Sequence, residues 1–288
     1  MTVTASRSTA SRKRARFRPG SFIIGALLIA FSVVMVSPLV WLISTSFTQA
    51  GSAFTIPPNW LPIPFTTQNY ADIESLIPFG RMFLNSITVA VVSTVGSLFF
   101  SVLAAYAFAR LSFRGSRLLL VLMLSALMVP AQLIVIPLFV LMRNLGLVDS
   151  LAALWLPALI NVFQIFFLTQ YFRTIPRELD EAATIDGAGH AWILFRMLVP
   201  LSLPAISALA ILGFESSWNN YFSPLIFIYS PENMTLPLGL VLLQGALSGA
   251  PAVVVFAAIS AVVFPVLVIF LIFQRAFVSS IASTGLKG

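Results

Sequence analysis

Six long apolar stretches separated by short polar segments limit what this chain can fold into more than any other feature. The first, residues 22–46, contains no charged residue and exceeds the roughly 20 residues that a helix needs to cross a bilayer. Only 9% of the 288 residues are charged, against about 25% in a soluble domain, and the mean hydropathy is +1.01. A helix satisfies its own backbone hydrogen bonds in lipid, so the chain is predicted to be an all-α polytopic membrane protein.

The predicted spans differ in how polar residues interrupt them. They are residues 22–46, 85–109, 118–142, 151–172, 204–228 and 251–274. The first could instead be a signal peptide, but an apolar signal core is only about 7–15 residues long, so a retained helix is expected. Pro130 and Pro137 interrupt the third span, where a kink is expected.

The polar segments divide the chain into regions. The predicted regions are a disordered basic tail at 1–20, a first transmembrane helix at 21–46, an extracytoplasmic loop at 47–80, a core of five further transmembrane helices at 81–275 that includes a cytoplasmic loop at 176–204, and a cytoplasmic tail at 276–288. The density of prolines in 47–80 argues against a long helix there.

The lysines and arginines assign the two sides of the membrane. With the N-terminus inside the cell, fourteen of the sixteen basic residues fall in cytoplasmic segments, and only Arg81 and Arg143 fall outside. Cytoplasmic loops of membrane proteins carry this excess of positive charge. Six spans with both termini in the cytoplasm are therefore predicted, and the net charge of +7 needs no nucleic acid to explain it.

Several kinds of chemistry have no candidate residues. The chain has no cysteine and one histidine, His190, so neither a thiolate nor a histidine-based metal site is expected. It has no Walker A sequence, and no paired carboxylates or histidine clusters in an arrangement typical of an enzyme. We therefore expect a membrane protein that is not itself an enzyme and binds no metal or cofactor.

The loop at 176–204 is the longest polar interruption in the second half of the chain and holds four of its nine acids. Pro176 suits the first turn of a helix, and acidic residues after it favour the positive end of the helix dipole. Gly187 follows where such a helix needs to end. A slim acidic helix is suited to dock into another protein, although an ordinary solvated loop remains the alternative.

The spacing within this loop resembles a known family. Glu181, Ala182 and Ala183, then Asp186 and Gly187, and finally Met197-Leu198-Val199-Pro200 are similar to the EAA signature of the inner-membrane permeases of binding-protein-dependent ABC importers. In that signature Ile and Leu stand where this chain has Met197 and Val199. We call residues 176–204 the EAA loop.

Other segments extend the resemblance over nearly the whole chain, to the carbohydrate branch and its MalG-type subunit. These segments are Gln68-Asn69-Tyr70, Asn85-Ser86, Ala104-Ala105-Tyr106-Ala107 with Arg110, and Trp218-Asn219. The resemblance implies a MetI-like permease fold in the bacterial plasma (inner) membrane. It also implies import of a sugar or oligosaccharide as a multi-pass subunit.

The resemblance further implies a set of partners. These are a second permease subunit in a heterodimer, two copies of a cytoplasmic ATPase that binds ATP and Mg, and an extracytoplasmic solute-binding protein. The EAA loop then couples the ATPase to alternating access. The implied coupling residues are Glu181, Ala182, Ala183, Asp186, Gly187 and Pro200.

A polar cluster lies in the middle of the fifth predicted span. On a continuous helix, Glu215, Trp218, Asn219 and Phe222 fall at i, i+3, i+4 and i+7 and share one face. An acid, an amide and an aromatic ring can hydrogen-bond and stack a sugar, so these four residues are predicted to line the translocation pathway. Hydrogen bonding between helices is the alternative.

Two other functional classes remain as alternatives. A secondary transporter or channel would act without an ATPase, but Glu215 is the only clear charge predicted within a span, and it has no relay partner. An integral-membrane enzyme lacks candidate catalytic groups. The leading prediction is the permease subunit of an ATP-driven importer.

Overall fold

The computed structural model describes residues 19–56, 59–245 and 249–285, and it is helical throughout. Within these ranges there is no β-strand, and the only strand-like pairing is an isolated antiparallel bridge between Thr48 and Phe65. The all-α prediction is confirmed. The basic tail predicted at residues 1–20 lies almost wholly outside the described residues.

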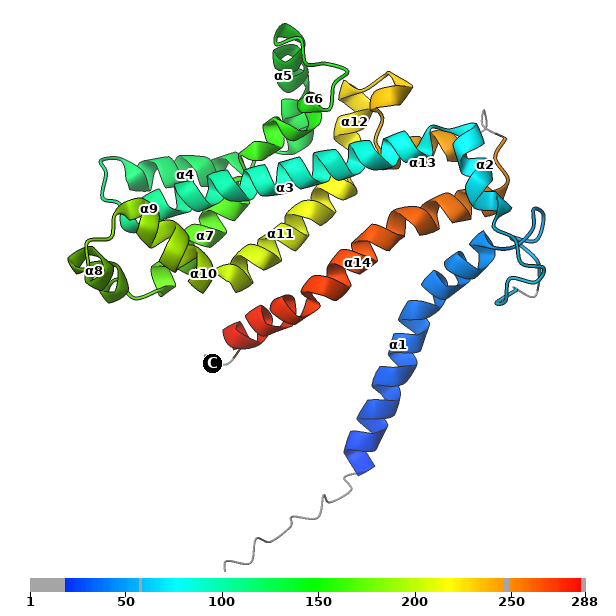
Figure 1. The fold of residues 1–288 in the computed structure, drawn as a ribbon, viewed down its shortest axis with the longest axis horizontal. Coiled ribbons are helices and arrows are strands. Elements are labelled where there is room, and N and C mark those ends of the chain that lie inside the picture. Colours follow the sequence, from blue (N-terminus) through cyan, green and yellow to red (C-terminus); the bar gives the residue numbers. More distant parts are fainter. Residues whose placement is uncertain (1–18, 57–58, 246–248, 286–288) are drawn as a thin grey trace, which may run out of the picture.

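The helices follow one another in the order shown in Figure 1. The first half of the chain contains α1 (Pro19–Ser46), α2 (Gln68–Leu76), α3 (Phe79–Arg110), α4 (Ser116–Ala126), α5 (Ala131–Asn144), α6 (Ala152–Trp155), the 3₁₀ turn η1 (Pro157–Leu159) and α7 (Val162–Thr174). The second half contains α8 (Glu178–Ile185), α9 (His190–Trp192), the π-helix η2 (Ile193–Leu198), α10 (Val199–Leu201), α11 (Leu203–Trp218), α12 (Phe222–Phe227), the 3₁₀ turn η3 (Pro231–Asn233), α13 (Leu236–Gln244) and α14 (Ala252–Gly285).

Four helical segments among the described residues are long and apolar enough to cross a membrane. They are Ile23–Ser46, Phe79–Arg110, Ala152–Thr174 and Ala252–Ile272. The pair His190–Leu201 and Leu203–Trp218 passes the same test together, but it is bent by 78°. The structure therefore contains four candidate spans, or five if the bent pair is one span. The last helix, α14, continues to Gly285, so most of the tail predicted at 276–288 has a helical backbone.

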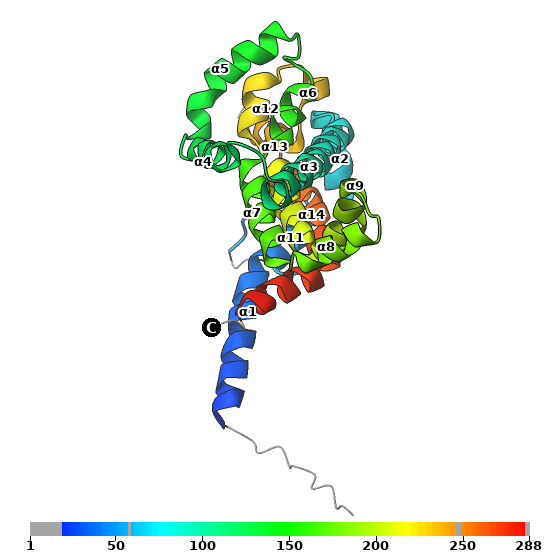
Figure 2. The ribbon, with the colours of Figure 1, turned by 90° about the vertical axis from the view of Figure 1, so that its left-hand side faces the viewer.

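The third predicted span is not one helix. Residues 118–142 form α4 and α5, of 11 and 14 residues, separated by a break that ends at Pro130. Proline has no N–H to donate and pushes the residue before it out of helical geometry, so it ends α4 rather than bending it. Figure 2 shows α5 rising away from the line of α4. Pro137 lies inside α5 and does not break it.

Helix α3 lies at the centre of the molecule, packed against α7 and α11, while α14 packs against α1 and α11 (Figure 1). Small residues let the helices approach closely: Ala90 and Ala105 of α3 and Ala257 of α14 are fully buried. A Cβ added at Gly96 would lie 2.3 Å from Leu159 Cδ2, so this position of α3 admits only glycine without movement of its neighbour.

The segment after α1 is tied back to that helix through α2. Asn69 is 4% exposed, and its Nδ2 donates to the carbonyl oxygens of Ser46 and Thr48, at 2.8 Å each. The Tyr70 hydroxyl is 2.8 Å from Ser46 Oγ. The motif at 68–70 therefore holds the predicted extracytoplasmic loop in an ordered arrangement.

The Phe79 end of α3 holds the segment that leads into α13. Asn85 Nδ2 donates to the carbonyl oxygens of Glu232 and Met234, at 2.8 and 2.9 Å. The hydroxyl of Ser86 accepts a hydrogen bond from the backbone N–H of Leu236 at 2.8 Å. Neutral side chains of α3 thus bind a segment that lies about 150 residues further along the sequence.

Asp149 joins the same region to the link after α5. It has a positive φ of 61°, and its Oδ1 accepts from the backbone N–H groups of Tyr229 and Ser230 at 3.1 and 3.0 Å. The Ser230 hydroxyl donates to the other carboxylate oxygen. Burial acts to raise the pKa of Asp149, but these hydrogen bonds outweigh it and hold the pKa below its ordinary value.

Candidate functional site

The EAA loop begins with a short helix whose end is made by glycine. Pro176 lies two residues before α8, and the first turn carries Glu178, Asp180 and Glu181, which favour the positive end of the helix dipole. At the other end Gly187 has φ +84°, a left-handed conformation that costs other residues about 1–2 kcal/mol.

Two hydrogen bonds confirm how this helix stops. The N–H of Gly187 donates to the carbonyl of Thr184 at 3.0 Å, and the N–H of Ala188 donates to the carbonyl of Ala183 at 2.9 Å. This pair of bonds is the Schellman motif, with glycine at the left-handed position. Asp186 is the C-cap residue just before the turn.

Helix α8 has one buried side and one exposed side. Ala183 is 9% exposed and packs in the same apolar cluster as Tyr106 and Ala109 of α3. Glu181 and Ala182 are exposed, as is Ile185, at 86%. Of the two alanines implied to pack in a partner, only Ala182 is on the accessible side in this conformation.

Three arginines bind the Arg110 end of α3 to the end of α7 and the start of the EAA loop. Arg173 and Arg177 donate to the carbonyl oxygens of Phe108 and Ala109, at 3.2 and 3.1 Å. These carbonyls belong to the last turn of α3 and have no partner within the helix. Arg110 in turn donates to the carbonyl of Ile175 at 3.0 Å.

Arg110 also forms an ion pair with Asp180 of α8. Arg110 Nε lies 2.6 Å from Asp180 Oδ2, with the side chains 5% and 18% exposed. The Nε–H is not aligned for a hydrogen bond, so the contact is mainly electrostatic. Asp180 is one of the acids expected to favour the start of this helix and its docking, and its pairing with Arg110 was not predicted. The sequence signal for this pair is an arginine at the end of one apolar run and an acidic loop at the end of another, both predicted on the same side of the membrane.

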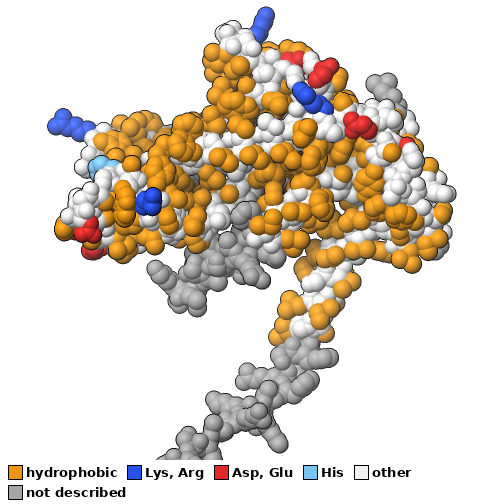
Figure 3. Space-filling view, viewed as in Figure 1, with side chains coloured by type: hydrophobic (Ala, Val, Ile, Leu, Met, Phe, Trp, Pro, Cys, Tyr) orange, Lys and Arg blue, Asp and Glu red, His pale blue; other side chains and the backbone are white. Residues whose placement is uncertain are grey.

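His190 is the first residue of α9, and its Nδ1 lies 2.8 Å from the Tyr106 hydroxyl of α3. This hydrogen bond adds a second polar link between α3 and the EAA loop. In Figure 1, α8, α9 and α10 all gather beside the Arg110 end of α3, away from α2 and α13. In Figure 3, charged side chains collect towards these two ends, and hydrophobic side chains dominate the band between them.

Pro200 acts on the helix before it. Residues Ile193–Leu198 form a π-helix, whose turn is wider than that of an α-helix. Proline cannot donate to the carbonyl four residues back and clashes with it, which accounts for the wider turn directly before Pro200. Ile193, Leu194 and Leu198 are buried, whereas Trp192 and Phe195 are about half exposed.

The four residues predicted to line a pathway do not share one continuous helix. Helix α11 ends at Trp218, Asn219 is its C-cap, and Phe222 begins α12 after a break. The expectation of a single helical face is therefore wrong. Glu215 and Asn219 are exposed and bonded to each other, with Asn219 Nδ2 donating to Glu215 Oε1 at 2.8 Å.

Trp218 lies in the core of the chain. It is 1% exposed, stacks on Phe214 with ring centroids 5.6 Å apart, and meets Phe83 of α3 edge-on. Its Nε1 donates to the carbonyl of Val262 in α14 at 3.2 Å. In this conformation its ring is not available to stack on a sugar.

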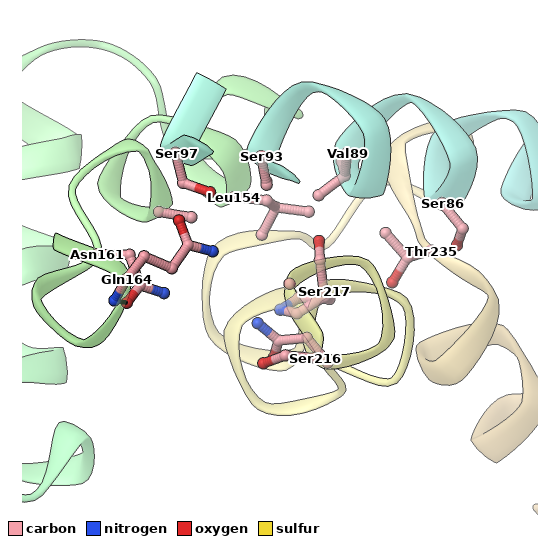
Figure 4. A pocket seen from close by; sticks show the side chains of 14 residues that line it. Ser86, Val89, Ser93, Ser97, Leu154, Asn161, Gln164, Ser216, Ser217 and Thr235 are labelled. Carbon is pink, nitrogen blue, oxygen red and sulfur yellow. Dashed lines mark hydrogen bonds between the residues drawn. The ribbon is translucent and has the colours of Figure 1, made fainter. Parts of the chain in front are cut away.

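A polar cavity lies on another side of α11. It encloses about 110 Å³ between α3, the start of α7 and the end of α11, and its fourteen lining residues are all uncharged. In Figure 4, Ser93 and Ser97 of α3 lie across it from Ser216 and Ser217. This volume is large enough to hold ordered water.

Asn161 and Gln164 border this cavity, and each side chain accepts a hydrogen bond. Asn161 Oδ1 caps α7 by accepting from the N–H of Gln164 at 3.0 Å. Gln164 Oε1 accepts from Ser101 of α3 at 3.2 Å. The hydroxyls of Ser93 and Thr235, each 4% exposed, have no partner among the described residues, so water is their natural partner.

Comparison with known proteins gives a consistent result. Residues 97–283 match the model of the family described as "Binding-protein-dependent transport system inner membrane component". The chain is 36% identical over 265 residues to the sulfoquinovosyl glycerol transport system permease protein SmoH of Agrobacterium fabrum, covering 90% of this chain and 93% of that protein. It is 34% identical to the arabinooligosaccharides transport system permease protein AraQ of Halalkalibacterium halodurans, covering 92% and 95%.

A solved structure has a similar fold. It is a bacterial ABC transporter involved in the import of the acidic polysaccharide alginate, and one of its chains matches with a TM-score of 0.77 and 26% identity. The match covers 94% of this chain and 100% of that chain. The predicted MetI-like permease fold and the resemblance to this family are confirmed.

Proposed function

The chain belongs to the family of binding-protein-dependent transport system inner membrane components, and we propose that it is the permease subunit of an ATP-driven importer for a sugar or oligosaccharide. The exposed side of α8 carries this proposal: an eight-residue helix with acids in its first turn, ended by Gly187 and standing out from the bundle. The relatives are named for the transport of glycosides and oligosaccharides, which supports the substrate class.

The proposed topology has six spans with both termini in the cytoplasm of a bacterium, in its inner membrane. The broken pair α4 and α5 supplies the span that length alone does not detect. The end of the molecule that carries α8 also carries three arginines, Arg110, Arg173 and Arg177. Cytoplasmic segments carry an excess of positive charge, so this end is proposed to be cytoplasmic.

The proposed assembly pairs this chain with a second permease subunit. Two copies of a cytoplasmic ATPase supply the ATP and Mg site, and a solute-binding protein delivers substrate on the α13 side. Glu181 and Ala182 contact the ATPase. Asp186 and Gly187 set the direction in which the chain leaves α8, and Pro200 sets the π-helix that follows. Closure of the ATPase dimer then displaces α8 and switches the accessible side of the permease.

The proposed pathway lies against the partner permease. Glu215 and Asn219 present a bonded acid–amide pair on the exposed side of α11, and Phe222 is 41% exposed just beyond the break. Trp218 supports this surface from behind by packing against Phe83. An exposed acid within a helix of this kind is expensive in lipid, so it belongs at a protein or water interface.

The test is ATP-dependent uptake of candidate sugars by the complex that copurifies with the tagged chain in membrane vesicles. An ATPase should copurify, and uptake should require ATP. Gly187→Ala should lower uptake severalfold, because alanine disfavours φ +84° by about 1–2 kcal/mol. The matched control, Gly189→Ala, has ordinary φ and open space and should transport normally. Uptake without an ATPase would refute the proposal.

A further inference from the structure

The peptide chain does not connect the EAA loop directly to α3. The loop follows α7 and leads into α11, so any displacement of α8 reaches those two helices through the backbone. Helix α3 instead runs into α4 at Arg110, well before the loop in sequence. Movement of α8 can therefore reach α3 through non-covalent contacts and not through an adjoining stretch of backbone.

Those contacts are concentrated in the last two turns of α3. Arg173 and Arg177 hold its terminal carbonyls, Arg110 pairs with Asp180, and Tyr106 meets His190. Charged hydrogen bonds and ion pairs are stronger than neutral ones when they are shielded from water. Arg110, whose side chain is 5% exposed, is more shielded than Arg173 and Arg177, which are exposed.

The opposite end of α3 is attached just as specifically to another segment. Asn85 and Ser86 bind the backbone of residues 232–236 through three hydrogen bonds of 2.8 to 2.9 Å. These residues end the link from α12 to α13, and Asp149 also holds this link through Tyr229 and Ser230. We call residues 229–236 the far segment. Helix α3 thus makes defined polar contacts with a loop at each of its ends.

Between these ends α3 is a single helix. It has 32 residues and no internal proline, and from Asn85 to Arg110 it spans roughly 37 Å at 1.5 Å per residue. Close packing at Gly96 against Leu159 and burial of Ala90 and Ala105 leave little room for bending. A helix packed in this way moves as a unit.

We propose that α3 is a strut that carries the displacement of α8 to the segment 229–236, and that Arg110 and Asp180 are the positioning pair through which it is driven. This inference rests on the proposed function, because it assigns a route to the ATP-driven displacement of α8. Arg173 and Arg177 reinforce the same joint from the side of α7. Asn85 and Ser86 deliver the motion at the far end.

The absence of cysteine from the sequence makes a direct test possible. Tyr229→Cys places a single thiol on the far segment, at a side chain that is 65% exposed. The copurified complex in nanodiscs is labelled with a membrane-impermeant maleimide, with and without Mg and a non-hydrolysable ATP analogue. The labelling rate of this chain is followed by mass. In the parent complex we expect the nucleotide to change that rate.

In the same background, Arg110→Gln and Asp180→Asn should each reduce the nucleotide-dependent change by about tenfold, within the usual range for coupled sites. The ATPase should still copurify and bind nucleotide, which a general loss of folding would not allow. Arg110→Lys keeps the charge and should restore part of the response. Arg114→Gln alters an exposed arginine in the link between α3 and α4 and should respond like the parent.

A second variant covers the case in which Arg110→Gln does not assemble. Arg177→Gln removes an exposed donor to the end of α3 and should reduce the response by about twofold. A full response in the assembled variants would overturn the strut alone. No nucleotide response in the parent would count against the coupling role, and with it against the proposed function.

Discussion

The two ends of α3 are held by different chemistry. At the Arg110 end the contacts come from three arginines, one aspartate and a histidine, and the aspartate lies on α8, a helix with an exposed outer side. At the Phe79 end an amide and a hydroxyl make the shorter bonds to backbone groups, beside a longer one of 3.4 Å from Arg81, and the segment is fixed again by Asp149. Charge contacts tolerate small changes of geometry, whereas short neutral hydrogen bonds do not.

This difference suggests two mechanical roles. Ionic contacts stay attractive over several ångströms, so the Arg110 end can hold α8 while it shifts. Directional bonds at the Phe79 end keep one register between α3 and the segment 232–236. We therefore expect removal of the Asp180 charge and removal of the Asn85 amide to lower the free energy of unfolding by different amounts.

The largest effect on stability should come from the buried ion pair. Asp180→Ala leaves Arg110 charged and 5% exposed without its partner, which should lower stability by about 3 kcal/mol. Thermal unfolding of the purified complex in detergent measures this change. Glu178→Ala, an exposed acid on the same turn, is the control and should cost less than about 1 kcal/mol. Equal losses for the two acids would show that the pair does not hold α8.

A smaller loss is expected at the opposite end. Asn85→Ala leaves the carbonyl of Met234 without its donor, and leaves that of Glu232 with only the longer bond from Arg81 Nε at 3.4 Å. The site is shielded from water, because Asn85 is 4% exposed. The expected cost is about 2 kcal/mol, from the same unfolding measurement. Thr88→Ala removes an exposed hydroxyl that bonds only within α3 and should change stability by less than about 0.5 kcal/mol. If Asn85→Ala were as mild, the Phe79 end would not be fixed by this amide.

The smallest effect concerns acid. The pKa of Asp149 is lowered in the folded protein, so its carboxylate stabilises the fold above the ordinary value of 3.8, and this contribution is lost as the pH falls towards the folded value. Stability should therefore fall with pH in this window. Asp149→Asn cannot titrate and should show a shallower acid dependence, measured by unfolding temperature against pH. A parallel pH profile in this variant would rule out Asp149 as a contributor.

Some features followed from local sequence alone. The apolar runs identified most of the membrane-crossing helices, and the turn at Gly187 follows from a glycine placed after a short acidic helix. The fixed spacing of Glu181, Gly187 and Pro200 indicated the family that the comparisons confirm. These features depend on residues close together in the chain, whose interactions are local.

Other features were missed because they depend on long-range packing. No periodicity shows that Arg110 meets Asp180, or that Trp218 turns inwards to Phe83 and Val262. The break after Trp218 moved Phe222 onto another helix, so a face drawn on an ideal helix did not exist. Ser216 and Ser217 line the polar cavity, whereas the sequence pattern had indicated their neighbours Glu215 and Trp218.

The sequence by itself determined that this chain is helical, membrane-embedded and equipped with a glycine-ended acidic helix, because chain length in lipid, backbone satisfaction and left-handed φ are local requirements. The tertiary structure alone decided which polar groups are exposed and which hold the chain together. Glu181 and Asp180 are adjacent acids on one short helix, yet one is exposed and the other is paired with Arg110. Only the position of α3 beside that helix separates their roles.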